Sequence, residues 1–155
     1  MANNLGKAFE ARFKSDFSKI PNSSIDRIYD PGFGMRGISN ICDFIGYVKP
    51  NIFYLECKSK KGNTFPLINL KQYEKLTVKQ NIPGTVVGVI LWFIDHDKVL
   101  FIPISTFDKL IEDDKKSFNI KMLGDERYKS IEIPSVKKRT FMESDYTVLL
   151  NTEDK

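Results

Sequence analysis

Two carboxylates and an ammonium group lie at a spacing that could hold a metal ion and cleave a phosphodiester. Glu56 and Lys58 are two positions apart in FYLECKSK, residues 53–60, and twelve residues separate Asp43 from Glu56. Side chains alternate along a strand, so Glu56 and Lys58 share one face and Cys57 takes the other. Two carboxylates together with a backbone carbonyl, here that of Cys57, suit Mg²⁺ or Mn²⁺. Such an ion acidifies a water and neutralises charge on a phosphate, while Lys58 orients the water or steadies the phosphate.

Two strands are expected to bring these groups together. Residues 40–48 and 52–59 read as strands joined by a Lys-Pro-Asn connection, which predicts a tight antiparallel pair. This pairing folds Asp43 back beside Glu56 or Lys58. Two carboxylates this close repel each other unless a cation lies between them. The alternative reading is an ordinary ion pair at the solvated end of a strand, in which the acid and the base do no chemistry.

The two cysteines and the single histidine do not indicate a site of their own. Cys42 and Cys57 lack the paired spacing of a zinc site, and one histidine cannot complete such a site. His96 lies between two aspartates and reads as the tip of a hairpin, with metal ligation as the alternative. Both thiols are expected to pack as small core hydrophobes. Each is adjacent to an acid, so Asp43 and Glu56 should emerge together on the face opposite the thiols.

Hydrophobic periodicity predicts an α/β arrangement around these two strands. Apolar residues recur at spacings of three and four over residues 5–20, which indicates a helix capped by Asn3 or Asn4 and ended by Pro21. Residues 85–94 are almost all apolar, as is typical of a central strand buried on both faces. The predicted order is helix, three strands, helix, two strands, helix. The remaining strands are expected at residues 25–30 and 99–104 and, with a weaker signal, at residues 128–133. The remaining helices are expected at residues 69–80 and 105–111.

Length and composition indicate one globular domain. The chain has 155 residues, is 41% hydrophobic and 28% charged, and shows no internal repeat or low-complexity linker. We therefore expect a single domain over residues 1–155, with the residues after about 140 at its periphery. No apolar run reaches the ~18 residues needed to span a membrane, and the first residues are unlike a secretion signal. Two cysteines do not form a disulfide scaffold, so a reducing, cytoplasmic location is expected.

The net charge of +4 is unevenly distributed along the chain. Residues 1–80 contain 13 lysines and arginines against 7 acids, whereas residues 81–155 contain 11 against 13. The half that contains FYLECKSK is therefore the basic one. A basic surface attracts polyanions such as nucleic acid, although many basic proteins bind none. Lys60 and Lys61 follow the strand directly and could hold the phosphates that flank the cleaved bond, or simply be solvated.

The spacing of Asp43 and Glu56-Cys57-Lys58 resembles the D-(x)n-(D/E)-x-K signature of the PD-(D/E)xK nuclease superfamily. With Phe44 after the aspartate and Thr-Phe-Pro-Leu at residues 64–67, the segment is similar to the RecU-type Holliday junction resolvases. That family has a comparable interval between its acids and an S/T-F-P-L stretch after its lysine. The likeness extends over about residues 40–76. It implies a restriction-endonuclease-like α/β core, in which helices flank a mixed central sheet.

The resemblance implies roles for the matching residues. Asp43 and Glu56 would be catalytic acids that ligate the metal ion, with the carbonyl of Cys57 as a further ligand. Lys58 would be the catalytic lysine. Glu10, in the first predicted helix, matches an acid that such nucleases carry there. The alternative for Glu10 is a solvated glutamate on the helix surface.

DNA contacts are expected around this site. RecU-type enzymes project a stalk into the centre of the junction, and PGFGMRG, residues 31–37, occupies the corresponding place but is shorter than the family stalk. The alternative for this segment is a surface loop. The resemblance also implies a helix glutamine near the site, which this chain matches only with a small gap. The candidate DNA-binding residues are Phe33, Met35, Arg36, Lys60, Lys61 and Gln72.

Together these features predict a divalent-metal-dependent endonuclease that resolves four-way DNA junctions in recombination and repair. Mg²⁺ is the expected ion and Mn²⁺ the alternative. Symmetric nicking requires two sites related by a two-fold axis, which predicts a homodimer on branched DNA. No membrane and no small-molecule cofactor are expected. Two alternatives stay open: another nuclease of the superfamily, acting on duplex or flapped DNA, and a DNA-binding protein that keeps the fold without catalysis.

Overall fold

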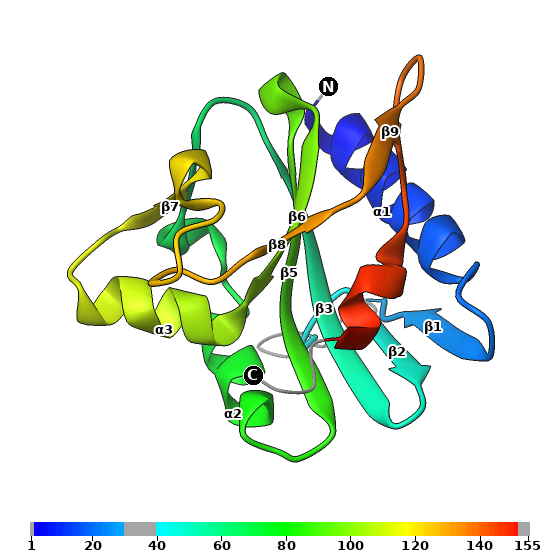
Figure 1. The fold of residues 1–155 in the computed structure, drawn as a ribbon, viewed down its shortest axis with the longest axis horizontal. Helices are drawn as coiled ribbons and strands as arrows, with labels where there is room; N and C mark the ends of the chain where they lie inside the picture. Colours follow the sequence, from blue (N-terminus) through cyan, green and yellow to red (C-terminus); the bar gives the residue numbers. More distant parts are fainter. Residues whose placement is uncertain (1, 30–39, 152–155) are drawn as a thin grey trace, which may run out of the picture.

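The computed structural model describes residues 2–29 and 40–151, and Figure 1 shows its fold. In this part of the chain, helices are interspersed among groups of strands. The longer elements are α1 (Ala2–Phe17), β1 (Ser23–Arg27), β2 (Phe44–Val48), β3 (Asn51–Lys60), β4 (Thr64–Pro66), α2 (Tyr73–Gln80), β5 (Thr85–Phe93), β6 (Lys98–Pro103), α3 (Ile104–Glu112), β7 (Ser117–Asn119), β8 (Ile131–Ile133), β9 (Ser135–Lys137) and β10 (Met142–Ser144). Short 3₁₀ helices are η1 (Leu67–Asn69), η2 (Ile94–His96), η3 (Ile120–Met122) and η4 (Tyr146–Asn151).

A six-stranded mixed sheet forms the centre of the molecule. Its strand order is β1-β2-β3-β5-β6-β8, and β3 and β5 are the parallel neighbours, whereas the other pairs are antiparallel. The predicted hairpin is present, with Val48 opposite Asn51 across the connection from β2 to β3. Two smaller antiparallel pairs, β4–β7 and β9–β10, lie outside this sheet. The mixed α/β architecture predicted from the sequence is therefore confirmed.

The central strand β5 divides the core into two layers because its residues are buried on both faces. Val89 and Leu91 pack with α3 on one side of the sheet, and Ile90 and Trp92 pack with α1 on the other. Figure 1 shows α1 on one side of the sheet and α2 with α3 on the other. A continuous apolar run is what a strand covered by helices on both faces requires, so this prediction is confirmed.

The aromatic stripe of α1 covers one face of the sheet. Phe9, Phe13 and Phe17 are at most 5% exposed, and the ring centroids of Phe17 and Phe53 are 5.6 Å apart. Full burial of aromatic side chains supplies much of the apolar area of a core, at about 25 cal/mol per Å². This packing fixes the helix against β3, the strand that carries Glu56.

The first helix ends earlier than predicted and has a different start. α1 ends at Phe17, and Ile20 lies in the following turn, where its N–H donates to the Phe17 carbonyl at 3.0 Å. Asn22 then adopts a left-handed backbone with φ of 58°, which turns the chain into β1. The helix begins at Ala2, so the two asparagines expected as caps lie inside it.

Two other predicted elements are shorter than their sequence patterns. The helix predicted over residues 69–80 is divided, because η1 takes Leu67–Asn69 and α2 begins only at Tyr73. The strand predicted over residues 128–133 is confined to β8, where three residues pair with β6. In the described part of the chain, none of the helices is both long enough and apolar enough to cross a membrane.

The C-terminal segment belongs to the core, although the sequence pattern placed residues after about 140 at the periphery. Met142, Tyr146 and Leu149 are at most 3% exposed and pack in the layer that contains α1. The ring centroid of Tyr146 lies 4.9 Å from that of Phe13, in an edge-to-face arrangement. The segment thus packs beside α1 in the same layer of the core (Figure 1).

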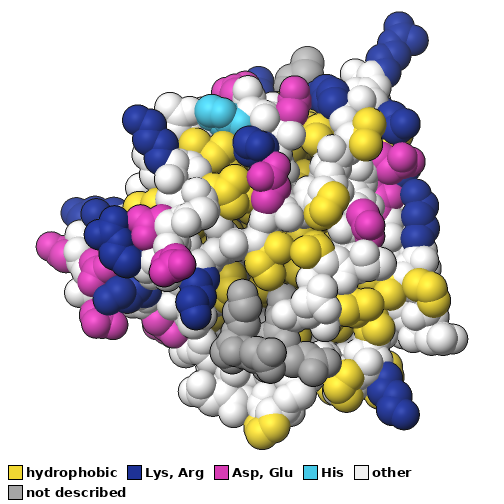
Figure 2. All heavy atoms as spheres, in the orientation of Figure 1, with side chains coloured by type: hydrophobic (Ala, Val, Ile, Leu, Met, Phe, Trp, Pro, Cys, Tyr) yellow, Lys and Arg dark blue, Asp and Glu magenta, His cyan; other side chains and the backbone are white. Residues whose placement is uncertain are grey.

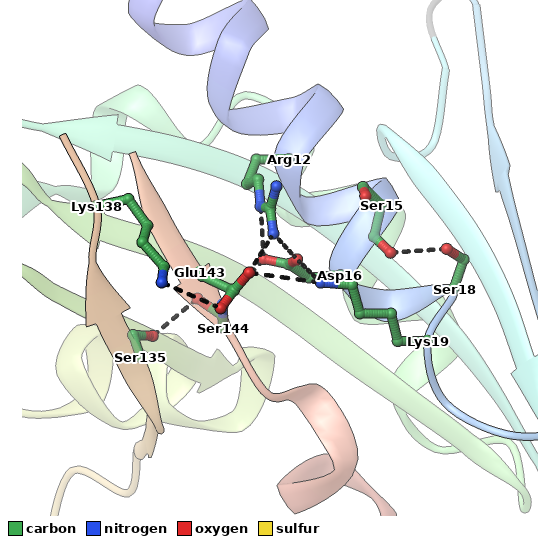
Figure 3. A network of polar contacts seen from close by, with 9 residues as sticks. All are labelled: Arg12, Ser15, Asp16, Ser18, Lys19, Ser135, Lys138, Glu143 and Ser144. Carbon is green, nitrogen blue, oxygen red and sulfur yellow. Dashed lines mark hydrogen bonds and ion pairs between the residues drawn. The ribbon is translucent and has the colours of Figure 1, made fainter. Parts of the chain in front are cut away.

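A polar network joins α1 to the β9–β10 hairpin, as Figure 3 shows. The carboxylate of Asp16, a residue that is 2% exposed, lies at its centre. Its oxygens accept hydrogen bonds from the Arg12 guanidinium at 3.1 Å and from the Ser144 backbone N–H at 2.9 Å. Arg12 also forms an ion pair with Glu143 at 3.1 Å. The network therefore fixes one flank of α1 to β10.

Candidate active site

Asp43 lies where β2 leaves the sheet. The β2–β3 ladder begins with Phe44 opposite Leu55, and not at residue 40 as the sequence pattern suggested. Beyond Phe44 a side chain continues the contact with β3: Asp43 Oδ2 accepts a hydrogen bond of 2.9 Å from the Cys57 N–H. The carboxylate is thereby held against β3 beside Glu56. The predicted proximity of the two acids is present.

The cysteines are buried as predicted, but the argument drawn from them about the faces of the strands is wrong. Cys57 packs in the layer with α1, whereas Cys42 packs in the opposite layer. The chain at Cys42 precedes β2 and does not follow its alternation, so the thiols share no face. Burial raises the pKa of Cys42 to about 12 and that of Cys57 well above its ordinary value, so neither thiol ionises near neutral pH.

Glu56 has a buried carboxylate, and among the described residues one of its two oxygens has no hydrogen-bond partner. The residue is 2% exposed, and its Oε2 lies 3.4 Å from Lys58 Nζ. Its Oε1 is buried and has no hydrogen-bond partner within the described residues. Burial, and next the negative charge of Asp43, raise the pKa of Glu56 to about 7, while Lys58 opposes the shift. A buried, unpartnered carboxylate oxygen beside a second carboxylate is a position where a cation would be stabilised.

Arg27 is a member of the site that the sequence pattern did not reveal. Its guanidinium forms ion pairs with Asp43 Oδ1 at 2.9 Å and with Glu10 Oε2 at 3.2 Å. Arg27 belongs to β1, where it lies opposite Phe44. The D…ExK signature does not extend to β1, so only the pairing of β1 with β2 places this arginine beside Asp43.

Glu10 reaches the site from α1. It forms the ion pair with Arg27, and its carboxyl group has a raised pKa because of burial first and the charge of Asp43 second. Arg27 and Lys58 act in the opposite direction on this pKa. The alternative of a freely solvated glutamate is therefore less consistent with the structure than a place near Asp43.

The donor set fits a hard divalent cation that keeps several waters. Asp43 and Glu56 are the two carboxylates nearest the end of the β2–β3 ladder, and Mg²⁺ commonly binds proteins through one or two carboxylates. Within residues 2–29 and 40–151, no group of three or more His, Cys, Asp or Glu side chains is arranged to hold a metal ion. The ligand set of Asp43, Glu56 and the Cys57 carbonyl stays a prediction.

The remaining candidate residues lie on different elements of the fold. Lys60 ends β3, and Lys61 follows it on the surface. Gln72 precedes the first turn of α2, and its buried Oε1 has no hydrogen-bond partner among the described residues. His96 is exposed in η2, and its Nε2 lies 2.7 Å from Asn63 Oδ1.

The predicted stalk residues lie outside the described part of the chain: Phe33, Met35 and Arg36.

The mixed sheet, with two acids and a lysine where β2 leaves β3, defines a restriction-endonuclease-like protein. The structure is similar to that of Hjc, a Holliday junction resolvase from Archaeoglobus fulgidus, with a TM-score of 0.56 and 18% sequence identity. The similarity covers 79% of this chain and 91% of that chain. No curated protein matches the sequence.

The particular family follows from the sequence itself. The family model of RecU, recombination protein U, matches residues 36–150, and the chain belongs to this family of Holliday junction resolvases. The match includes Asp43, Glu56 and Lys58 but begins after α1 and β1. Glu10, which the sequence had suggested, and Arg27, which it had not, lie outside the matched residues and reach the site from α1 and β1.

Proposed function

We propose that this protein is a divalent-metal-dependent endonuclease that resolves four-way DNA junctions by symmetric nicking. The observation that supports this most directly is the buried Glu56 carboxylate, which lies beside Asp43 and Lys58 and keeps one oxygen unpartnered. A protein that used this acid only for stability would be expected to satisfy both oxygens. Membership of the recombination protein U family supplies the class of substrate.

Asp43 and Glu56, with the Cys57 carbonyl, would hold the metal ion. We propose Mg²⁺, with Mn²⁺ as the alternative. When bound, the ion acidifies the attacking water and neutralises charge on the phosphate. Lys58, whose ammonium is 3.4 Å from Glu56 Oε2 and whose side chain is 28% exposed, would orient that water or contact the phosphate. The hydrogen bond from the Cys57 N–H keeps Asp43 in place throughout.

Symmetric cutting of a junction requires two such sites. One chain supplies a single set of Asp43, Glu56 and Lys58, so we propose a homodimer in which a two-fold axis relates the sites. We also propose that residues 1–155 form a single nuclease domain. Recognition would depend on junction shape and phosphate contacts, because a junction has no fixed sequence.

Cleavage of a defined panel of substrates tests the proposal. Purified protein should introduce paired nicks at symmetric positions in a labelled four-way junction with added Mg²⁺ and none with EDTA. Glu56→Gln and Lys58→Ala should each reduce the rate by at least about a hundredfold, because each removes a group that acts at the reacting phosphate. Both variants should still bind the junction.

Matched flap, nicked and linear duplex substrates provide the contrast. Cleavage confined to linear duplex or to the flap would replace the resolvase by another nuclease of the same fold. Cleavage by Glu56→Gln at the wild-type rate would show that the site has been wrongly assigned. Binding to the junction without any cleavage would identify a DNA-binding protein.

A further inference from the structure

A groove opens beside the active site along one flank of α1. It has a volume of about 210 Å³, and its lining includes Lys7, Glu10, Lys14, Arg27, Tyr29 and Phe44. Two of these residues, Glu10 and Arg27, form the ion pair that reaches Asp43. The groove therefore adjoins the active site through the ion pairs of Arg27 with Glu10 and Asp43.

The helix places its lysines along this groove. Positions 7, 10 and 14 are three and four residues apart, so their side chains share one flank of α1. Lys7 and Lys14 are exposed, and within the described residues the side chain of neither forms an ion pair or a hydrogen bond. The guanidinium of Arg27 is already paired with two carboxylates. The groove thus presents two ammonium groups that are available to anions.

An exposed aromatic ring lies in the same groove. Tyr29 is 77% exposed, and the guanidinium carbon of Arg27 lies 5.8 Å from its ring centroid. An exposed aromatic ring beside a cationic track is the combination with which proteins bind single-stranded nucleic acid: lysines follow the phosphates and the ring stacks on a base. Such stacking accepts any base, which suits recognition without sequence preference.

Other surfaces are less suited to a polyanion. The opposite flank of α1 is engaged with the β9–β10 hairpin through Arg12 and Asp16, as Figure 3 shows. On the face seen in Figure 2, acidic and basic side chains are interspersed over α3 and β7, so their charges largely offset each other. The groove combines available lysines, an aromatic ring and direct continuity with the acids of the site.

We infer that this groove binds one DNA strand of the branched substrate, with phosphates on Lys7 and Lys14 and an unpaired base on Tyr29. The inference rests on the proposed function, because the bound strand continues from the groove to Asp43 and Glu56. Bases at a branch point leave the stack more readily than bases within a duplex. The groove therefore favours a strand at the branch over a strand in a continuous helix.

Binding measurements on a cleavage-deficient background test the lysines. The probes are a fluorescein-labelled four-way junction and a single-stranded oligonucleotide, and anisotropy is recorded over a series of NaCl concentrations with Glu56→Gln protein. Lys7→Ala and Lys14→Ala should each weaken binding about five- to tenfold at about 0.1 M salt and lower the log–log salt slope by about 1. The matched control is Lys121→Ala, an exposed lysine of η3 in the other layer, which should change neither quantity.

Two substitutions of Tyr29 test the proposed stacking role of its aromatic ring. Tyr29→Ala should weaken binding of the single strand about five- to a hundredfold, the usual range for one stacked base, without changing the salt slope. Tyr29→Phe keeps the ring and should bind like the parent. Equal loss in both variants would overturn the stacking role, as would a lack of any loss in Tyr29→Ala.

The outcomes separate this inference from the proposed function. If the wild-type protein cuts the junction while the Lys7, Lys14 double variant binds and cuts equally well, the groove assignment is overturned and the function stands. An equal loss of affinity in Lys121→Ala would likewise overturn the groove assignment, because the loss would then reflect the total positive charge of the protein. If the wild-type protein cuts no junction but its DNA binding depends on these lysines, the groove stands and the resolvase function falls.

Discussion

Arg27 supplies one positive charge between two acids of the candidate site. Its guanidinium pairs with Glu10 and Asp43, whereas the more deeply buried Glu56 forms an ion pair with Lys58 alone among the described residues. Charges brought out of water are stable only when they are paired. The arginine thus keeps the carboxylates compatible with folding before any cation is bound.

Removal of this arginine should make stability depend more strongly on divalent metal. Arg27→Ala leaves Glu10 and Asp43 without their common partner, so in EDTA the free energy of unfolding should fall by about 2 kcal/mol. Mg²⁺ should recover more stability in the variant than in the wild type, because the ion replaces the missing charge. Urea unfolding of both proteins, with and without Mg²⁺, measures the difference.

Arg27→Lys is the matched control for this experiment. It keeps the charge but cannot present two donors in a planar fork, so it should recover only part of the loss. Unchanged stability of Arg27→Ala in EDTA would show that the two ion pairs contribute nothing to the fold.

Glu56 should make the metal-free protein less stable as the pH rises. Its pKa is raised to about 7 in the folded protein, against an ordinary value of 4.5. Between these values the unfolded chain has released a proton that the folded protein keeps, so the free energy of unfolding falls, by about 3 kcal/mol at most. Urea unfolding in EDTA between pH 4.5 and pH 7 should show this decline.

The variant Glu56→Gln isolates the contribution of this acid. It cannot ionise, so its stability should decline less than that of the wild type over the same pH range, and the two curves should converge at the acidic end. Parallel curves for the two proteins would contradict the assignment of the raised pKa to Glu56.

At the scale of elements, α1 is fixed along both flanks. One flank carries Glu10, which meets β1 through Arg27, and the other carries Asp16, which holds β10 through the Ser144 N–H (Figure 3). Between them the aromatic stripe packs on the sheet. The position of Glu10 in the site therefore depends on contacts made on the far side of the helix.

Asp16→Ala should lower the free energy of unfolding and loosen the position of Glu10 in the site. The carboxylate is almost fully buried and accepts hydrogen bonds from Arg12 and Ser144, so its loss should cost about 3 kcal/mol in urea unfolding. Junction cleavage should also fall, because α1 carries Glu10. Lys138→Ala removes an ion pair between partly exposed groups and should cost less than about 1 kcal/mol. Equal effects of the two substitutions would contradict this role of Asp16.

At the scale of the whole molecule, one chain supplies one set of Asp43, Glu56 and Lys58, whereas the proposed substrate has two equivalent strands to be cut. A dimer should therefore be the active species, with a mass about twice 17.9 kDa by sedimentation at concentrations that cut junctions. Mixed dimers of wild-type and Glu56→Gln chains should nick one strand only. Symmetric cutting by a protein that sediments as a monomer would contradict the proposed assembly.

Local patterns in the sequence determined much of the fold. The alternation in FYLECKSK, the short connection before it and the apolar run of β5 correctly predicted the β2–β3 hairpin and the buried central strand. These signals are reliable because they depend on neighbours in the chain and on burial alone. The pairing of Glu56 with Lys58 also followed, since the two residues lie on one strand.

Only the tertiary structure decided which further groups complete the site. Arg27, which no sequence pattern indicated, meets Asp43 because β1 pairs with β2. Glu10 was a candidate from the sequence, and the packing of α1 decided that it reaches Arg27. The opposite placement of Cys42 and Cys57 followed from the end of the β2 ladder, which no alternation pattern marks. The sequence by itself therefore determined the elements and the catalytic signature, while contacts between distant segments determined the charge balance around them, because such contacts have no fixed spacing along the chain.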